Sequence, residues 1–158
     1  MQTITPFLWF DNQAEEAVNF YVSIFKNSSV GKMARYDKAT AAASGRSEGS
    51  VMTASFKING QDFIALNGGP IFHFTEAISF VIGCDSQEEI DYYWDKLTGN
   101  GGSESQCGWL KDRFGLSWQV VPNKMAQLIA GPDPAKSQRA MAAMMKMKKL
   151  VIADLENA

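Results

Sequence analysis

Apolar and polar positions follow the same order twice along the chain. The apolar, aromatic-rich run 4–10 predicts a strand, and apolar residues at helical spacing then predict a helix that is capped by Asp11 or Asn12 and ends near residue 26. The run 78–84 predicts a second strand of this kind, followed by a helix over 86–97. Because self-similarity at this scale indicates a repeated structural unit, we interpret the chain as two copies of one module.

Further strands complete each copy. Segments 30–36, 50–58 and 61–66 predict strands in the first copy, and Asn59-Gly60 between the last two is a strong hairpin signal. In the second copy the short strands are 103–106, 108–111 and 116–121, with a turn at 112–115. We therefore expect an α+β fold with two βαβββ modules that form a curved mixed sheet.

Two segments fall outside this pattern, and the chain composition changes after Pro122. Segment 37–49 is small, polar and without periodicity, which predicts a loop, and 67–76 predicts a linker. We expect a domain over 1–122, with modules at 1–69 and 76–122, and a C-terminal helical extension over 123–158. Its predicted helices are 123–130, 134–149 and 151–156.

Composition narrows the classes of function. With 158 residues and a net charge of −2, the chain lacks the clustered positive charge that nucleic-acid binding requires. No apolar run approaches the roughly 20 residues that span a bilayer, and the N-terminus lacks a signal-peptide pattern. Two cysteines, Cys84 and Cys107, are expected to be free thiols in a reducing compartment. We therefore predict a cytoplasmic protein that binds neither nucleic acid nor membrane.

Several short motifs resemble one known family. Asn19-Phe20-Tyr21 ends the first helix, Leu66-Asn67-Gly68-Gly69-Pro70 opens the linker, and the run from Cys107-Gly108-Trp109 to Gln119 contains Asp112-Arg113-Phe114-Gly115-Leu116-Ser117-Trp118. With the repeated βαβββ pattern, these motifs resemble the PhnB-like branch of the glyoxalase/vicinal-oxygen-chelate superfamily, often labelled 3-demethylubiquinone-9 3-methyltransferase. The resemblance covers residues 3–122. It implies a concave sheet face that holds a substrate and often a divalent metal.

The resemblance also identifies where metal ligands would lie. The four ligand positions of the superfamily fall near Pro6, Ile64, Ile78 and Gln119, and only the Gln119 side chain can coordinate an ion. We therefore expect no metal and no cofactor. A methyltransferase activity is not favoured either, because an S-adenosylmethionine site of the usual kind needs a βαβ unit with a glycine-rich turn, which neither half contains.

Three residues are candidates for catalysis, each with a structural alternative. Glu76 precedes the fifth strand and could carry a proton in the cavity. His73, the only histidine, is a candidate base or a packed linker residue. Cys107 is expected on a strand beside Trp109 and Lys111, where it is a candidate nucleophile or an inert thiol. Other polar or sulfur-containing residues receive structural roles: Cys84 in the core, Asp85 as a helix cap and Asp112 in a turn.

The remaining candidates are ligand-binding residues. Aromatic side chains on the concave face would line a pocket for an apolar or planar ligand, and a few polar groups would orient it. The predicted set is Trp9, Asn67, Phe72, Phe74, Trp109, Lys111 and Gln119.

These observations lead to three hypotheses about function. The first is a metal-independent protein that binds a small molecule in the concave cavity. The second is a lyase, isomerase or dioxygenase-like enzyme that uses Glu76 or His73. The third is an interaction protein whose C-terminal helices bind a partner. The methionines at 141, 144, 145 and 147 are then either packed on the buried side of a helix or part of a contact surface. We favour the first and expect a homodimer.

Overall fold

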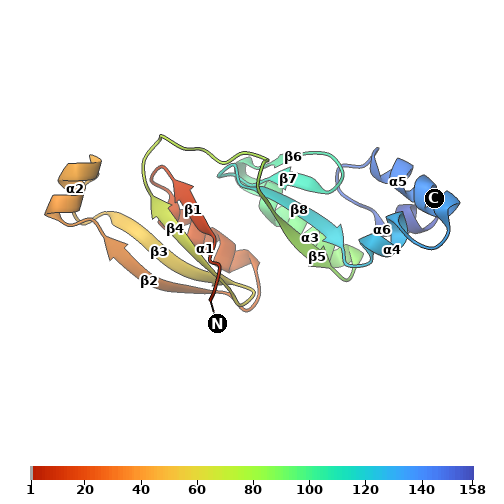
Figure 1. Ribbon diagram of the computed structural model, residues 1–158, viewed down its shortest axis with the longest axis horizontal. Helices are drawn as coiled ribbons and strands as arrows, with labels where there is room; N and C mark the ends of the chain where they lie inside the picture. The colour runs from red at the N-terminus through yellow and green to blue at the C-terminus, as the bar shows by residue number, and fades with distance from the viewer. Residues whose placement is uncertain (1) are drawn as a thin grey trace. The chain divides into compact units, whose positions relative to one another are not determined.

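The structure is a computed structural model that describes residues 2–158. The chain forms two compact units that divide after His73. Each unit contains one four-stranded sheet, and Figure 1 shows the second unit ending in helices near the C-terminus.

The sheet of the first unit has the strand order β1-β4-β3-β2. β1 is parallel to β4, and the other neighbours are antiparallel. The predicted hairpin joins β3 to β4, where Asn59 and Gly60 have φ angles of 47° and 82° as a type I′ turn requires. The strands are β1 (Phe7–Phe10), β2 (Ser29–Arg35), β3 (Val51–Ile58) and β4 (Gln61–Asn67), and the helix that packs on them is α1 (Ala14–Ile24).

The sheet of the second unit repeats this topology in the order β5-β8-β7-β6. β5 is again parallel to the last strand of its module, and β6, β7 and β8 are antiparallel neighbours. The prediction of two βαβββ modules is therefore confirmed. The elements are β5 (Ser79–Cys84), α3 (Gln87–Thr98), the 3₁₀ turn η1 (Gly99–Gly101), β6 (Ser103–Glu104), β7 (Trp109–Lys111) and β8 (Ser117–Pro122).

Each sheet buries one face under its helix. In the first unit, Tyr21 of α1 is fully buried and stacks on Phe56, with ring centroids 6.2 Å apart, and Phe56 stacks on Phe63 at 5.3 Å. In the second unit, Trp94 and Leu97 of α3 are buried. Because side chains alternate across a strand, the opposite face of each sheet is left for other contacts.

The C-terminal segment forms α4 (Met125–Ile129), α5 (Pro134–Met144) and α6 (Ile152–Glu156). Gln87 of α3 holds this segment, because its amide donates to the Leu150 carbonyl at 3.0 Å and accepts from the Ile152 N–H at 2.8 Å. Leu150 and Leu155 are fully buried, and Leu150 lies against Gly108, so the segment packs on the second module. The predicted helix over 134–149 ends earlier, at Met144.

The segment predicted as a loop at 37–49 contains a helix, α2 (Lys38–Ser44), so this prediction was wrong. Asp37 accepts a hydrogen bond from the Thr40 N–H, and the Thr40 hydroxyl accepts one from the Asp37 N–H. Gly45 ends the helix with a φ of 69°. This reciprocal cap and the glycine end stabilise a short helix that lacks apolar periodicity.

Two predicted helix caps also differ from the structure. Helix α1 begins after Gln13, whose side chain makes no cap, and the Ala14 N–H instead donates to the Asn67 Oδ1 atom at 2.8 Å. A distant residue therefore replaces Asp11 or Asn12. Helix α3 is capped by Ser86 rather than Asp85.

We expect Asn67→Ala to lower the free energy of unfolding by about 3 kcal/mol, because two buried backbone groups would lose their partners. These groups are the Ala14 N–H and the Val51 carbonyl, to which Asn67 Nδ2 donates at 3.1 Å. Urea denaturation would measure this change. The matched control is Asn12→Ala, which removes an exposed amide and should change stability by less than about 0.5 kcal/mol. Equal effects of the two substitutions would contradict the role of Asn67.

Candidate functional site

The face of the second sheet opposite α3 brings together three of the predicted ligand-binding residues. Leu110, Trp118 and Val120 are buried under α3, so their neighbours along β7 and β8 point the other way. Trp109 is paired with Gln119, and Lys111 is paired with Ser117. Trp109, Lys111 and Gln119 therefore share one face, as the sequence predicted.

Polar contacts orient these side chains. Gln119 Nε2 donates to the Ser79 hydroxyl of β5 at 2.9 Å, which fixes the amide on the sheet. Lys111 Nζ lies 2.5 Å from Glu76 Oε1. Ser117 is 1% exposed, and its hydroxyl has no hydrogen-bond partner within residues 2–158. A buried hydroxyl without a partner is unusual, because desolvation costs free energy that a hydrogen bond normally offsets.

A cavity of about 190 Å³ lies at this face. Its wall includes Trp109, Lys111, Glu76 and Ser117. Two predicted ligand-binding residues, Trp109 and Lys111, therefore line the same cavity as the catalytic candidate Glu76. The other lining residues are Ser103, Glu104, Ser105 and Leu110. An aromatic ring, a cation and hydroxyl groups around one hollow can hold a small planar molecule and orient its polar atoms.

The environment of Glu76 favours its charged form. The Lys111 ammonium donates a hydrogen bond to the carboxylate, and this bond, with the backbone N–H of Glu76 and the positive charge of Lys111, lowers the pKa of Glu76 below its ordinary value of 4.5. The carboxyl group is therefore ionised at neutral pH and only weakly basic. Such a group serves as a partner of Lys111 better than as a proton carrier.

Residues of the first unit form a separate aromatic cluster. Trp9 donates from its indole N–H to the Gly69 carbonyl at 2.8 Å, and its ring lies edge-on to Phe72 with centroids 4.9 Å apart. Phe72 and His73 are exposed in the linker, and Phe74, which begins the second unit, is half-buried. The ligand and catalytic roles predicted for Trp9, Phe72, His73 and Phe74 stay predictions.

Asn67 lies on the helix-facing side of its sheet, where its amide bonds the backbone of α1 and β3. Asn67 is 8% exposed, and the Tyr36 hydroxyl donates to its backbone carbonyl oxygen at 2.6 Å. Trp9 and Asn67 therefore point to opposite faces of the first sheet, because Leu8 and Phe10 on either side of Trp9 are buried under α1.

Cys107 was predicted on a strand, but it lies in a turn. Its φ angle is 58°, and β7 begins only at Trp109. The Cys107 N–H donates to the Met147 carbonyl at 2.8 Å, and its sulfur lies 3.8 Å from the Met145 sulfur. This positive φ breaks the strand alternation, so the expected shared face with Trp109 and Lys111 was wrong.

Both cysteines are free thiols, as expected. Cys84 is buried at the end of β5, in agreement with the predicted core role. Burial, together with the negative charges of Glu89 and Asp85, raises the pKa of Cys84 to about 12. This thiol is therefore neutral and unreactive at physiological pH.

Two residues of this site were not singled out from the sequence. Ser117 and Ser79 lie on the same sheet face as Gln119, and strict alternation along β8 would have placed Ser117 there.

Asp112 was assigned to a turn, and this holds: it is buried, and it accepts hydrogen bonds from the Phe114 and Leu116 N–H groups at 2.9 and 3.1 Å and from the Trp118 indole at 2.9 Å.

The donor atoms at the four implied metal positions do not fit a divalent ion. The Pro6 carbonyl accepts the Ile64 N–H at 3.0 Å, the side chains of Ile64 and Ile78 are apolar, and the Gln119 amide is bonded to Ser79. In the part of the chain that the structure describes, no three His, Cys, Asp or Glu side chains gather as a metal site. Hard cations require several oxygen or nitrogen ligands that converge on one point.

We predict that Lys111→Met raises the pKa of Glu76 toward its ordinary value, because the ammonium is the largest cause of the shift. A ¹³C NMR titration of the side-chain carboxyl would measure the pKa. Since the folded-state pKa is lowered, the pair stabilises the fold above the ordinary pKa and this effect is lost as pH falls through the folded value. Lys136→Met, an exposed lysine of α5, is the control that should leave the titration unchanged. A Glu76 pKa that does not move in Lys111→Met would contradict the pairing.

The 3-demethylubiquinone-9 3-methyltransferase family model matches residues 2–121. A putative 3-demethylubiquinone-9 3-methyltransferase, the PhnB protein from Bacillus cereus, is 37% identical with a TM-score of 0.67, and the match covers 77% of this chain and 99% of that one. No curated protein matches the chain significantly.

Two more distant structures share the fold. Protein PA1353 from Pseudomonas aeruginosa is 19% identical with a TM-score of 0.61, covering 77% of this chain and 98% of that one. The fosfomycin resistance protein FosX from Listeria monocytogenes, in complex with Mn(II) and sulfate, is 15% identical with a TM-score of 0.52, covering 80% and 93%. Within residues 2–158, no helix is long and apolar enough to cross a membrane. The chain belongs to the PhnB-like 3-demethylubiquinone-9 3-methyltransferase family, and it has the fold of the glyoxalase/vicinal-oxygen-chelate superfamily.

Proposed function

We propose that this protein binds a small planar or aromatic molecule on the open face of its second module, without a metal ion. The observation that carries the proposal is the buried Ser117 hydroxyl without a partner, in a cavity of about 190 Å³ beside Trp109 and Lys111. A bound acceptor atom would satisfy this hydroxyl, and the Trp109 ring would cover the apolar part of the ligand. The cavity is smaller than most drug-sized pockets, so a small metabolite or one end of a larger one suits it.

We propose binding without a metal because the side chains near the superfamily's metal-ligand positions are mostly unable to coordinate an ion. FosX is described with Mn(II), but Ile64 and Ile78 stand where the superfamily places ligands in this chain. The family name mentions methyl transfer, which usually needs a glycine-rich βαβ unit. In each sheet here, the first strand is instead parallel to the last strand of the module, and the last strand is antiparallel to the strand before it. Binding rather than methyl transfer is therefore the function we propose.

Catalysis by Glu76 or His73 stays a prediction. The lowered pKa of Glu76 counts against it as a proton carrier, because a carboxylate held by Lys111 is a poor base.

We further propose that the protein forms a homodimer through its exposed edge strands. β1 and β5 each lie at the edge of a sheet and carry an exposed apolar side chain, Phe7 at 55% and Val81 at 61%. Unprotected apolar edges favour association with another chain.

We expect the wild-type protein to sediment as a dimer at roughly 100 μM and the double variant Phe7→Glu, Val81→Glu as a monomer, because the charges would have to be buried. Analytical ultracentrifugation measures both. Tyr92→Glu, at a 40% exposed position of α3, is the control and should stay dimeric. A monomeric wild type would overturn the dimer proposal.

The ligand proposal predicts saturable binding of planar aromatic fragments to the full chain. In ¹⁵N NMR spectra of a fragment titration, we expect shifts of the Trp109 indole N–H and the Gln119 amide. Trp109→Ala should weaken binding at least about tenfold, which corresponds to about 1.4 kcal/mol of lost stacking. Tyr92→Ala removes an exposed ring elsewhere and should bind as wild type. The proposal fails if no fragment saturates below roughly 5 mM, or if Trp109→Ala binds as tightly as wild type.

A further inference from the structure

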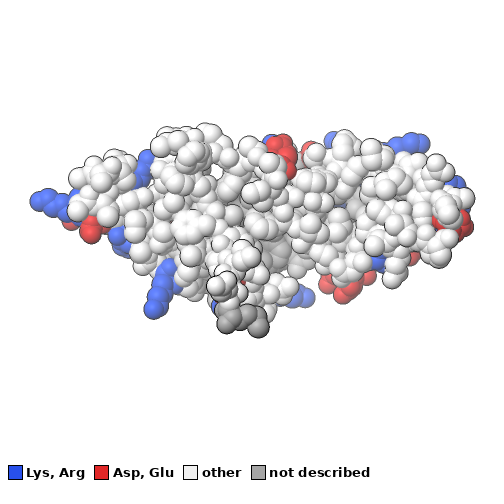
Figure 2. Space-filling model, in the orientation of Figure 1, with Lys and Arg blue, Asp and Glu red and all other residues white. Residues whose placement is uncertain are grey.

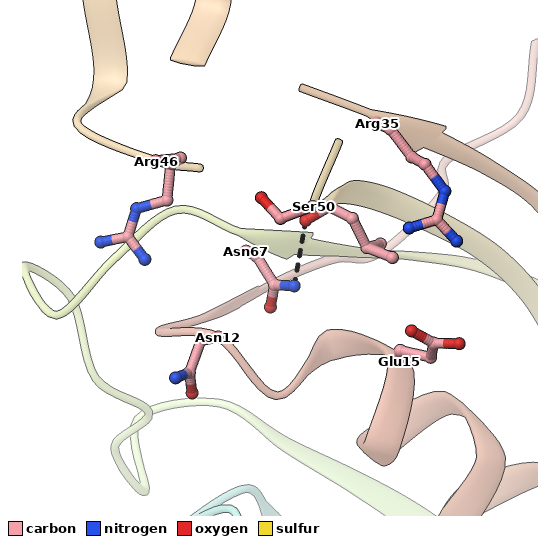
Figure 3. A pocket seen from close by; sticks show the side chains of 7 residues that line it. Asn12, Glu15, Arg35, Arg46, Ser50 and Asn67 are labelled. Carbon is pink, nitrogen blue, oxygen red and sulfur yellow. Dashed lines mark hydrogen bonds between the residues drawn. The ribbon is translucent and has the colours of Figure 1, made fainter. Parts of the chain in front are cut away.

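A second cavity, of about 290 Å³, lies within the first unit. It is on the side of the sheet that α1 covers, because Asn67 in its wall belongs to the helix-facing set of β4 and Glu15 in its wall belongs to α1 itself. The open face that carries Trp9 is the opposite one. Figure 3 shows the residues that line this cavity: Asn12, Glu15, Arg35, Arg46, Ser50, Val51 and Asn67.

Arg46 has a buried donor that the fold leaves unused. Its Nε atom is shielded from solvent and has no hydrogen-bond partner among residues 2–158. Its Nη1 donates to the Asp11 carbonyl at 3.3 Å and lies 3.6 Å from the Asp11 carboxylate. The guanidinium also packs over Gly69, where a Cβ would come within 2.6 Å of Nη2. The head group is therefore held in place while one of its donors remains unsatisfied.

The charges of the cavity indicate which ligand chemistry it can accept. Arg35 and Arg46 come from β2 and from the segment after α2, and Arg35 Nη1 donates to the Gly49 carbonyl at 3.0 Å. In Figure 3, Glu15 lies on the Arg35 side of the cavity, Asn12 lies on the Arg46 side, and the neutral residues Ser50 and Asn67 lie between the two arginines. An anion at the Arg46 end lies away from Glu15, and there it competes with the Asp11 carboxylate for the guanidinium.

We propose that this cavity binds the oxyanion group of a small molecule, a phosphate or a carboxylate, with Arg46 as the principal donor. Guanidinium groups present planar, forked N–H donors that match the oxygens of both anions, and charge-assisted hydrogen bonds of this kind are the strong ones. The oxyanion accepts the Arg46 Nε–H, and the Asn12 amide supplies a neutral donor. Arg35 adds long-range positive charge from the far wall. The site is separate from Trp109 and Ser117, which belong to the second unit.

The test uses the full chain and two probes, inorganic phosphate and acetate, at an ionic strength held constant with chloride. In ¹⁵N NMR spectra, we expect the Arg46 Nε–H and the backbone N–H groups of Asn12 and Ser50 to shift and saturate, with a Kd in the range of roughly 1–10 mM. Saturation by phosphate alone identifies a phosphate site, and saturation by acetate alone identifies a carboxylate site. A response to both supports a general oxyanion site.

Two variants separate specific binding from a general charge effect. Arg46→Lys keeps the charge but removes the Nε–H, and it should weaken binding at least fivefold, as followed by the Asn12 and Ser50 signals. Arg139→Gln removes the same charge from α5 in the second unit and should bind within twofold of wild type. The proposal is overturned if neither probe saturates, or if Arg46→Lys binds as tightly as wild type.

Discussion

The first module depends on the buried amide of Asn67. Its side chain accepts from the start of α1 and donates to the start of β3, and the backbone carbonyl of the same residue accepts the Tyr36 hydroxyl. Asn67 therefore joins α1, β3, β4 and the segment that follows β2 at one point. Because a buried polar group is costly without partners, the amide stabilises this arrangement only while all of these elements are in place. The two cavities described above are built on the frames of the separate modules, and the one in the first module has Asn67 in its wall.

Periodicity predicted the repeated module well because it reflects burial. Strands, helices α1 and α3, and the Asn59-Gly60 turn follow from alternation, helical spacing and backbone preference, all of which are local. The helix caps could not be predicted in the same way, since Asn67 caps a helix that begins 53 positions earlier in the chain. Helix α2 was missed for another reason: its stability comes from the Asp37–Thr40 cap rather than from an apolar face.

The same distinction applies to the candidate site. Trp109, Lys111 and Gln119 were placed together correctly, because the strands that carry them are regular and paired in register. Cys107 was misplaced because its left-handed backbone conformation ends the alternation. Neither the unpaired Ser117 hydroxyl nor the pairing of Lys111 with Glu76 can be derived from spacing alone, since both depend on which groups the tertiary structure brings close.

The packing of Trp9 on the glycines of the linker has an optical consequence. A Cβ at Gly68 would come within 2.2 Å of the indole ring, so the ring rests directly on bare backbone, and its N–H is bonded to Gly69. Its fluorescence spectrum consequently depends on the hydration of that short stretch of main chain. In a protein whose other three tryptophans were replaced by phenylalanine, the emission wavelength of Trp9 would report changes in the conformation of the linker.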